Sequence, residues 1–188
     1  MNYLDIYDKC FSFPEYNVHS LDLFTYQYAF DFINNNVSIK SIIDIGSGRG
    51  NFLRKLAQCD RNLKITSLDI SKYHNYSKCD FIQCDLSNKL DLDKMSGEWD
   101  IAVCLDVLEH LEENIIEDVV EFISRVGRMA CFSINCEKDT RYGMNLHLTI
   151  RYLEFWEKIL KNNYFIIDLV KLKNEIFMTC KSKCFFTF

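Results

Sequence analysis

The stretch 41-SIIDIGSGRGNFLRKL-56 decides the fold. It passes from a β-branched apolar segment through three alternating glycines into a segment whose apolar residues repeat at helical spacing. A strand, a glycine turn and a helix in this order are typical of the first unit of a doubly wound α/β sheet. In such a sheet the turn lies where the ligand binds, so the turn is the first candidate for function.

Apolar, strand-like runs recur along the rest of the chain and alternate with helical patterns. Strands that are apolar throughout and separated by helices indicate a parallel sheet covered on both faces. The last two runs are joined by a short turn, which favours an antiparallel hairpin. We therefore predict a doubly wound, mostly parallel seven-stranded α/β sheet with a C-terminal antiparallel strand. The expected strands cover residues 40–45, 63–68, 80–84, 99–104, 128–134, 164–173 and 175–186.

Helical spacing of apolar residues predicts four helices, over residues 20–33, 51–59, 114–126 and 150–161. The first of them should bury one face, formed by Leu21, Phe24, Tyr28 and Phe32, and the second a face formed by Phe52, Leu53, Leu56 and Ala57. Before them, an aromatic leader forms either a lid over the site or part of the core. Its aromatic residues are Tyr3, Tyr7, Phe11, Phe13 and Tyr16.

The 188 residues suit a single domain, which we divide into a helical lid segment (1–37) and a core with a doubly wound sheet (38–188). None of the nine cysteines forms a C-x-x-C pair, so zinc-ribbon and redox motifs are absent. We expect reduced, structural thiols and a cytoplasmic location. No apolar run approaches the ~20 residues that span a bilayer.

The glycine turn, residues 46–50, does not fit the two common phosphate-binding motifs. A dinucleotide fingerprint reads G-x-G-x-x-G, and its third glycine position is occupied here by Asn51. This difference also counts against a nicotinamide oxidoreductase. A Walker loop requires a Gly-Lys pair, which the sequence lacks. A ligand without phosphate is therefore favoured.

Three acidic residues, Asp44, Asp69 and Asp85, stand at the ends of the first three predicted strands. A carboxylate in the binding crevice repels pyrophosphate and attracts an ammonium or sulfonium cation. Asp69 is placed to accept hydrogen bonds from ribose hydroxyls, and Asp85 from an adenine amine. Each acid alone could be a solvated loop residue or a helix cap. Together they favour S-adenosyl-L-methionine, which combines ribose, adenine and a cationic amino acid.

The sequence resembles the class I S-adenosylmethionine-dependent methyltransferases, and within them the small subgroup similar to the ubiquinone-pathway O-methyltransferases. DIGSGRG (44–50) matches the family's first motif, LDIS (68–71) the second and CDL (84–86) the third. WDIAVCLDVLEHL (99–111) matches its fourth strand and the helix that follows. The four motifs agree in order and spacing, and the resemblance covers roughly residues 38 to 182.

The resemblance implies a set of cofactor-binding residues for S-adenosyl-L-methionine, whose product is S-adenosyl-L-homocysteine. Asp44 would lie near the methionine amino group, and Asp69 would hold the ribose. The glycines would let the backbone approach the cofactor, and the remaining residues would surround the adenine and the sulfonium. The set is Asp44, Gly46, Ser47, Gly48, Asp69, Ile70, Asp85, Leu86 and Leu105.

The candidate catalytic residue is His147, which follows the fifth predicted strand and precedes a helix. Related enzymes contact their acceptor in this loop, and an imidazole suits proton removal near neutral pH. Packing against the helix is the alternative. We expect His110 to orient or pack, and His19 and His74 to be exposed. Arg141, Tyr142 and Asn145 share the loop and could bind the acceptor. We predict no metal site.

The acceptor class is partly constrained by missing features. The sequence after the fourth predicted strand is not the Asp/Asn-Pro-Pro-aromatic motif of enzymes that methylate base amines. The net charge of −5 argues against a large nucleic-acid footprint. We therefore expect O- or N-methylation of a small molecule. The alternatives are an RNA or protein methyltransferase and a non-catalytic subunit with this fold; the oligomeric state stays open.

Overall fold

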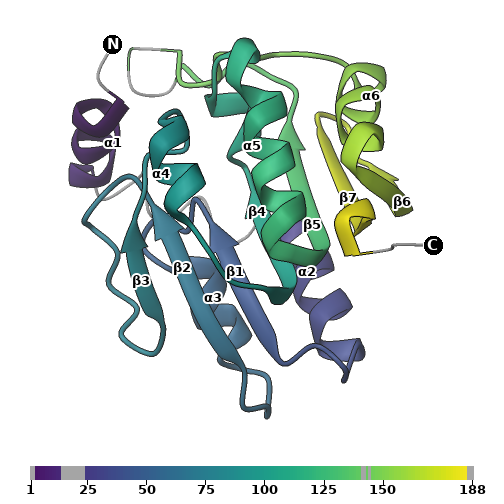
Figure 1. The fold of residues 1–188 in the computed structure, drawn as a ribbon. Coiled ribbons are helices and arrows are strands. Elements are labelled where there is room, and N and C mark those ends of the chain that lie inside the picture. Colours follow the sequence, from purple (N-terminus) through teal and green to yellow (C-terminus); the bar gives the residue numbers. More distant parts are fainter. Residues whose placement is uncertain (1–2, 14–23, 141–142, 144, 186–188) are drawn as a thin grey trace.

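A computed structural model describes residues 3–13, 24–140, 143 and 145–185 of the chain (Figure 1). At its centre is a seven-stranded sheet with the strand order β3-β2-β1-β4-β5-β7-β6. The strands are β1 (Ser41–Ile45), β2 (Lys64–Asp69), β3 (Asp80–Gln83), β4 (Trp99–Leu105), β5 (Gly127–Asn135), β6 (Tyr164–Lys171) and β7 (Glu175–Ser182).

The sheet is parallel except at β7, as the sequence predicts. β1 pairs in parallel with β2 and β4, β2 with β3, and β4 with β5. β7 lies between β5 and β6 and is antiparallel to both. The strand order reverses between β1 and β4, because the chain passes from β3 on one side to β4 on the other. The carboxyl ends of β1 and β4 therefore form the crevice where doubly wound sheets bind ligands.

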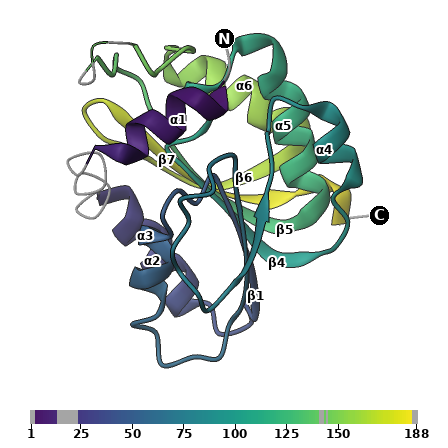
Figure 2. The ribbon, with the colours of Figure 1, turned by 90° about the vertical axis from the view of Figure 1, so that its left-hand side faces the viewer.

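Helices cover both faces of the sheet (Figures 1 and 2). In the two views, α2 and α3 lie on one face and α4, α5 and α6 on the other, while α1 lies across the end of the sheet. None of the helices in the described part of the chain is long and apolar enough to cross a membrane. Their bounds are α1 (Tyr3–Ser12), α2 (Phe24–Asn35), α3 (Asn51–Leu56), α4 (Lys89–Lys94), α5 (Glu113–Val126) and α6 (Leu153–Asn163).

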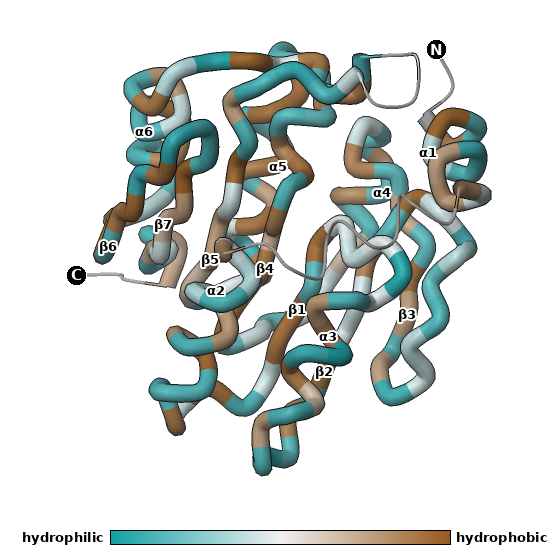
Figure 3. The backbone as a smooth tube through the Cα atoms, turned by 180° about the vertical axis from the view of Figure 1, so that it is seen from behind, coloured by the Kyte–Doolittle hydropathy of each residue, from teal (hydrophilic) through white to brown (hydrophobic). Residues whose placement is uncertain are grey.

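The period-two alternation of the strands builds two hydrophobic layers. In β4, Ile101 and Val103 join the layer beneath α2 and α3, whereas Ala102 and Cys104 join the layer beneath α5 and α6. Successive side chains of a strand point to opposite faces, so an apolar strand supplies both layers at once. In Figure 3 the hydrophobic, brown stretches recur along the strands and the teal ones along the connecting segments.

The prediction for α2 is wrong about its buried face. Residues 20–23 of the predicted helix, Leu21 among them, lie outside the described residues, and Phe24 is 73% exposed. The helix instead buries Thr25, Ala29 and Ile33. The small side chain of Ala29 sits at the centre of this contact, which lets the helix approach the sheet closely. Aromatic residues on the neighbouring positions pack around the contact rather than in it.

Two smaller expectations also fail. Ala57 is exposed although it was assigned to the buried face of α3, because the helix ends at Leu56 and Ala57 is its C-terminal cap. The helix α4 was not predicted at all. It has one turn and a half and buries Leu92, and its N-terminal cap is Asn88, whose side chain accepts a hydrogen bond from the Leu90 amide at 3.1 Å. A helix this short leaves no periodic apolar pattern to recognise.

The corrected face of α2 can be tested by two truncations. We expect Ile33→Ala to lower the free energy of unfolding by about 2–4 kcal/mol, because it opens a cavity in the core. Phe24→Ala should change it by about 0.5 kcal/mol or less, since an exposed side chain loses little burial. Urea unfolding of both variants measures the difference. A larger loss for Phe24→Ala than for Ile33→Ala would restore the originally predicted face.

Candidate active site

A cavity of about 540 Å³ opens at the carboxyl ends of β1, β2 and β4. Its volume falls within the range of about 300–1,000 Å³ that is typical of small-molecule sites. Asp44 aside, every predicted cofactor residue lines it, and so does His147. The predicted residues on its wall are Gly46, Ser47, Gly48, Asp69, Ile70, Asp85, Leu86, Leu105 and His147.

The glycine turn brings bare backbone to the cavity wall. Gly46 has a φ of +70°, a left-handed conformation that favours glycine, and a Cβ built there would collide with the side chain of Val107. Gly50 has a φ of +78°, and its Cβ would lie 2.7 Å from Cβ of Tyr76. The turn is fixed by the Ser47 amide, which donates to the Leu68 carbonyl at 2.9 Å. Because glycine has no Cβ, a ligand can approach the backbone here more closely than it could with any other residue type.

Asp44 lies behind this turn rather than on the cavity wall. It is buried in β1, and among the described residues its Oδ2 atom has no hydrogen-bond partner. Burial and, after it, the neighbouring charge of Asp69 raise the pKa of Asp44 to about 8. A buried carboxylate oxygen without a donor is costly. Asp44 is thus poised to gain from a cation placed beside it.

Asp69 ties the glycine turn to the end of β2. Its carboxylate accepts hydrogen bonds from the Gly48 amide at 2.7 Å and from the Ser71 amide at 2.8 Å. Burial raises its pKa to about 6, an increase that these two amides oppose and the charge of Asp8 reinforces. An ionised carboxylate has about four acceptor positions. Asp69 can therefore hold the turn and still accept hydrogen bonds from the hydroxyl groups of a ligand in the cavity.

Asp85 has a different local partner. Its Oδ1 atom accepts hydrogen bonds from the Ser87 amide at 2.9 Å and from the Ser87 hydroxyl at 2.7 Å. The residue is half-buried, as are Ile70 and Leu86, which add apolar wall to the same part of the cavity. Leu105, at the end of β4, is buried and closes the floor. This arrangement offers an apolar slot with one carboxylate at its edge.

The helix α1 covers the cavity, with Tyr7 and Phe11 among the lining residues. Two contacts fix it there: Ser71 Oγ donates to Asp8 at 2.8 Å, and the Arg49 guanidinium donates to the Phe11 carbonyl. This position suits the lid that we expected from the leader. Within the leader, Phe13 is 37% exposed, and Tyr16 lies outside the described residues.

Two histidines line another part of the cavity, which we call the histidine end. The rings of His110 and His147 are nearly perpendicular, with centroids 4.6 Å apart. Nδ1 of His110 lies 3.1 Å from the Leu146 carbonyl oxygen, and Nδ1 of His147 contacts the Glu137 carbonyl oxygen. A carbonyl only accepts, so each Nδ1 carries the proton. In the neutral rings both Nε2 atoms therefore hold the lone pair.

Glu109, which the sequence analysis overlooked, lies beside these histidines. It is fully buried: Oε1 accepts a hydrogen bond from the Asn135 amide at 2.7 Å, while Oε2 has no partner among the described residues. Burial and, after it, the charge of Asp106 raise its pKa well above the ordinary value. Asp106 has a φ of +55°, an unusual conformation for a residue other than glycine. Such outliers cluster at functional sites.

The remaining predicted loop and histidine residues have mixed outcomes. The expectation that His74 is exposed is wrong: its ring stacks on Phe81 at 4.7 Å, and Nε2 lies 3.0 Å from the Tyr76 carbonyl oxygen. Asn145 does not line the cavity, and its side-chain amide donates a hydrogen bond to the His147 carbonyl at 2.8 Å. His19, Arg141 and Tyr142 lie outside the described residues.

Comparison with known proteins adds to this geometry. Residues 43–131 match the family model described as a methyltransferase domain. Among curated proteins, none matches the chain in sequence. The matched region contains the glycine turn, all three acidic residues and the pair Glu109 and His110. The narrower resemblance to ubiquinone-pathway enzymes stays a prediction.

Three solved structures illustrate the likeness in fold. An O-methyltransferase family protein from Burkholderia thailandensis is 12% identical, with a TM-score of 0.63; the match covers 83% of this chain but only 55% of that one. The N-methyltransferase NodS from Bradyrhizobium japonicum, in complex with S-adenosylhomocysteine, is 14% identical over 97% of this chain and 100% of that one, with a TM-score of 0.70. The 1,6-didemethyltoxoflavin-N1-methyltransferase from Burkholderia thailandensis is 13% identical over 97% and 91%, with a TM-score of 0.67. The chain shares the Rossmann-like fold of these enzymes.

The buried carboxylate of Asp44 predicts an unusual pH dependence of stability. Its pKa rises from 3.8 to about 8 on folding, so the folded state binds the proton more tightly and stability falls as the pH rises between these values. We expect Asp44→Asn to remove this loss and to raise the free energy of unfolding by about 1–3 kcal/mol at pH 8, with a smaller gain at pH 5. Denaturant unfolding at both pH values measures it.

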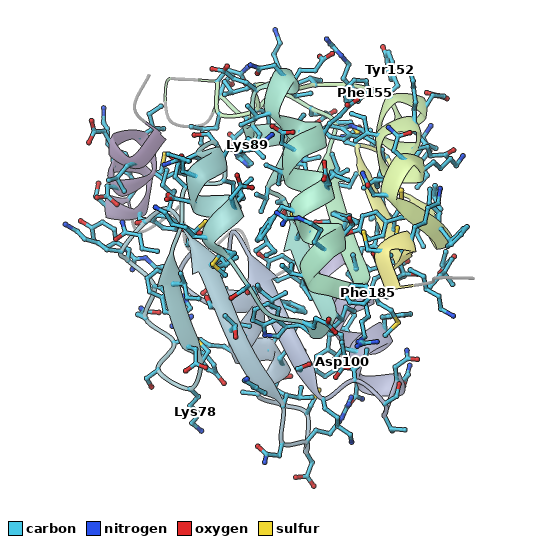
Figure 4. The ribbon with its side chains drawn as sticks, viewed as in Figure 1. Lys78, Lys89, Asp100, Tyr152, Phe155 and Phe185 are labelled. Atoms are coloured by element: carbon cyan, nitrogen blue, oxygen red, sulfur yellow. The ribbon has the colours of Figure 1, made fainter. Side chains whose placement is uncertain are left out.

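Asp100 is the matched control, because it lies at the other end of the sheet from α1 (Figure 4). It accepts hydrogen bonds from the Lys40 and Ser41 amides, and its pKa is lowered in the fold. Its stabilisation is present at neutral pH and fades as the pH falls through the folded pKa. Asp100→Asn should thus destabilise at pH 8. Equal losses from both substitutions at pH 8 would contradict the account of Asp44.

Proposed function

Because residues 43–131 match a methyltransferase domain and the chain has the fold of class I methyltransferases, we propose that it transfers a methyl group from S-adenosyl-L-methionine to a small-molecule acceptor. The observation that carries the proposal is the pair of buried acids, Asp44 and Asp69, at a glycine turn on a cavity wall. This arrangement suits a nucleoside with a positive charge.

The residues of the cavity fit this donor in charge and shape. Asp44 lies behind the glycine turn, and its Oδ2 atom, which has no hydrogen-bond partner among the described residues, suits the ammonium group of the methionine part. The remaining acceptor positions of Asp69 on the cavity wall suit two ribose hydroxyls. Ile70 and Leu86 offer apolar surface for adenine, and Asp85 an acceptor at its edge. Two buried acids would instead repel a pyrophosphate.

S-adenosyl-L-methionine supplies a methyl group on a sulfonium, which leaves readily as a neutral thioether. In the transfer, a lone pair of the acceptor forms the bond to the methyl carbon, and the electrons of the carbon–sulfur bond stay on sulfur. The cavity contributes mainly by holding the two reactants in line, an effect worth up to about 7–11 kcal/mol. A hydroxyl acceptor must also lose its proton. The lone pair that His147 offers at the histidine end would promote that loss.

We favour a small-molecule acceptor because α1 roofs the cavity and leaves it lined by aromatic rings. Tyr7 and Phe11 face the same space as the two histidines, and the Tyr7 ring lies 5.9 Å from that of His110. A concave pocket lined by aromatic rings is typical of sites for small molecules. The nine free cysteines support a reducing, cytoplasmic setting for the reaction.

Calorimetric titration with S-adenosylhomocysteine tests the proposed donor. We expect binding in the micromolar range, with no measurable binding of NAD. Asp69→Ala should weaken it by at least about 1–2 kcal/mol, roughly tenfold, through the lost hydrogen bonds to ribose. Asp100→Asn, remote from the cavity, should leave the affinity unchanged. Binding of NAD in preference to S-adenosylhomocysteine would reject the proposal.

His147→Ala separates catalysis from donor binding. The variant should bind S-adenosylhomocysteine as the wild type does, because His147 is not among the residues that we expect to hold the donor. Methylation of an acceptor found by screening metabolite pools should slow by about 10²-fold or more, in the range expected for loss of proton transfer. Unchanged turnover would reduce His147 to a packing residue.

A further inference from the structure

Three potential metal ligands converge at the histidine end of the cavity. Glu109, His110 and His147 each offer one ligand atom, and these atoms all lie within 4.8 Å of one another. In a tetrahedral site, atoms bound to one ion at about 2.1 Å lie about 3.4 Å apart. The most widely separated of the three ligand atoms would therefore need to approach one another by up to about 1.4 Å to share an ion.

The orientation of both imidazoles suits ligation. A metal-bound histidine usually donates its other ring N–H to a carboxylate or a backbone carbonyl, which fixes the tautomer. Both histidines have this arrangement, since Nδ1 of His110 faces the Leu146 carbonyl and Nδ1 of His147 faces the Glu137 carbonyl. The nitrogen with the lone pair is then Nε2 in each ring.

The glutamate provides an independent sign of a missing cation. Glu109 is completely buried, and its Oε2 atom has no hydrogen-bond partner among the described residues. Its other oxygen accepts a hydrogen bond from the Asn135 amide at 2.7 Å, which orients the carboxyl group. The cavity also contains Asp106, whose charge acts on Glu109. A bound cation would give Oε2 of Glu109 a partner and would offset the repulsion between Glu109 and Asp106.

We propose that Glu109, His110 and His147 bind one divalent transition-metal ion at the floor of the histidine end. Two imidazole nitrogens and one carboxylate favour ions such as Mn²⁺, Co²⁺ or Zn²⁺ over Mg²⁺ and Ca²⁺, which prefer oxygen ligands alone. The set contains no thiolate, which argues against a closed structural zinc site. Three protein ligands leave coordination positions open toward the cavity.

This proposal rests on the proposed methyl transfer and narrows its acceptor to a hydroxyl compound. An acceptor oxygen in an open position would have its proton released to water, because a divalent ion lowers the pKa of a bound hydroxyl. The oxygen lone pair then forms the bond to the methyl carbon, while the electrons of the carbon–sulfur bond remain on sulfur. The metal is neither oxidised nor reduced. His147 would thus act as a ligand rather than as a free base, and the sequence-based expectation of no metal would be wrong.

The test is a titration of chelator-treated protein with Co²⁺, in which the visible absorption bands of the bound Co²⁺ report binding. We expect saturation at one ion per chain, without methyl donor or acceptor present. Glu109→Gln should weaken Co²⁺ binding by about tenfold or more, and His110→Ala provides a second, independent variant in case the first does not fold. The control is Glu117→Gln, which removes the same charge from an exposed position of α5 and should bind Co²⁺ as the wild type does.

Calorimetry with S-adenosylhomocysteine, run on the same samples, separates this proposal from the one it rests on. We expect all folded variants to bind S-adenosylhomocysteine within about twofold of the wild type. Wild-type protein that binds S-adenosylhomocysteine but not Co²⁺ would overturn the metal site and leave the proposed function standing. Equal Co²⁺ affinity in the wild type, Glu109→Gln and His110→Ala would also overturn it.

Discussion

The burial of two carboxylates beside one glycine turn is the constraint on which the rest of the site depends. Burial raises the pKa of both carboxyl groups well above the ordinary range; the charge of Asp69 adds to the increase at Asp44, and the charge of Asp8 to that at Asp69. Two backbone amides donate hydrogen bonds that stabilise the ionised carboxylate of Asp69, whereas Oδ2 of Asp44 has no hydrogen-bond partner among the described residues. Such a site is stabilised by a ligand that brings hydroxyl donors and a positive charge. The two buried carboxyl groups lower the stability of the protein without ligand, and in the proposed function they favour a nucleoside that carries a positive charge.

The topology of the sheet concentrates these groups at one place. The strand order reverses between β1 and β4, so the glycine turn after β1 and the Asp106–His110 segment after β4 flank the same crevice. The segment after β5 closes the histidine end with His147, and α1 covers the opening. In the proposed reaction, donor and acceptor would meet between two chemically distinct parts of the cavity: acids and bare backbone in one, imidazoles beside a buried glutamate in the other.

The parts that the sequence predicts are those governed by local periodicity. All seven strands lie close to the expected ranges, because the strands of a sheet covered on both faces are the segments that need continuous apolar, β-branched runs. Tertiary packing decided the rest. The prediction for α2 was wrong because the helix buries Ala29 completely, whereas the ring of Tyr28 stacks on Phe177 of β7 at the margin of the contact and stays partly exposed. Glu109 was overlooked because a glutamate beside a helix start resembles a solvated acid, and only the fold shows its full burial. His74 likewise has partners that are distant in sequence, such as Ser47 and Gly48, as well as near neighbours in the chain.

A crystal structure of the chain with S-adenosylmethionine bound is the most direct test of the central claim. The account predicts the ribose hydroxyls on Asp69, the methionine amino group beside Asp44 and the methyl group pointing toward His110 and His147. A donor bound away from residues 44–50, or a diphosphate group bound at the glycine turn in its place, would contradict the account.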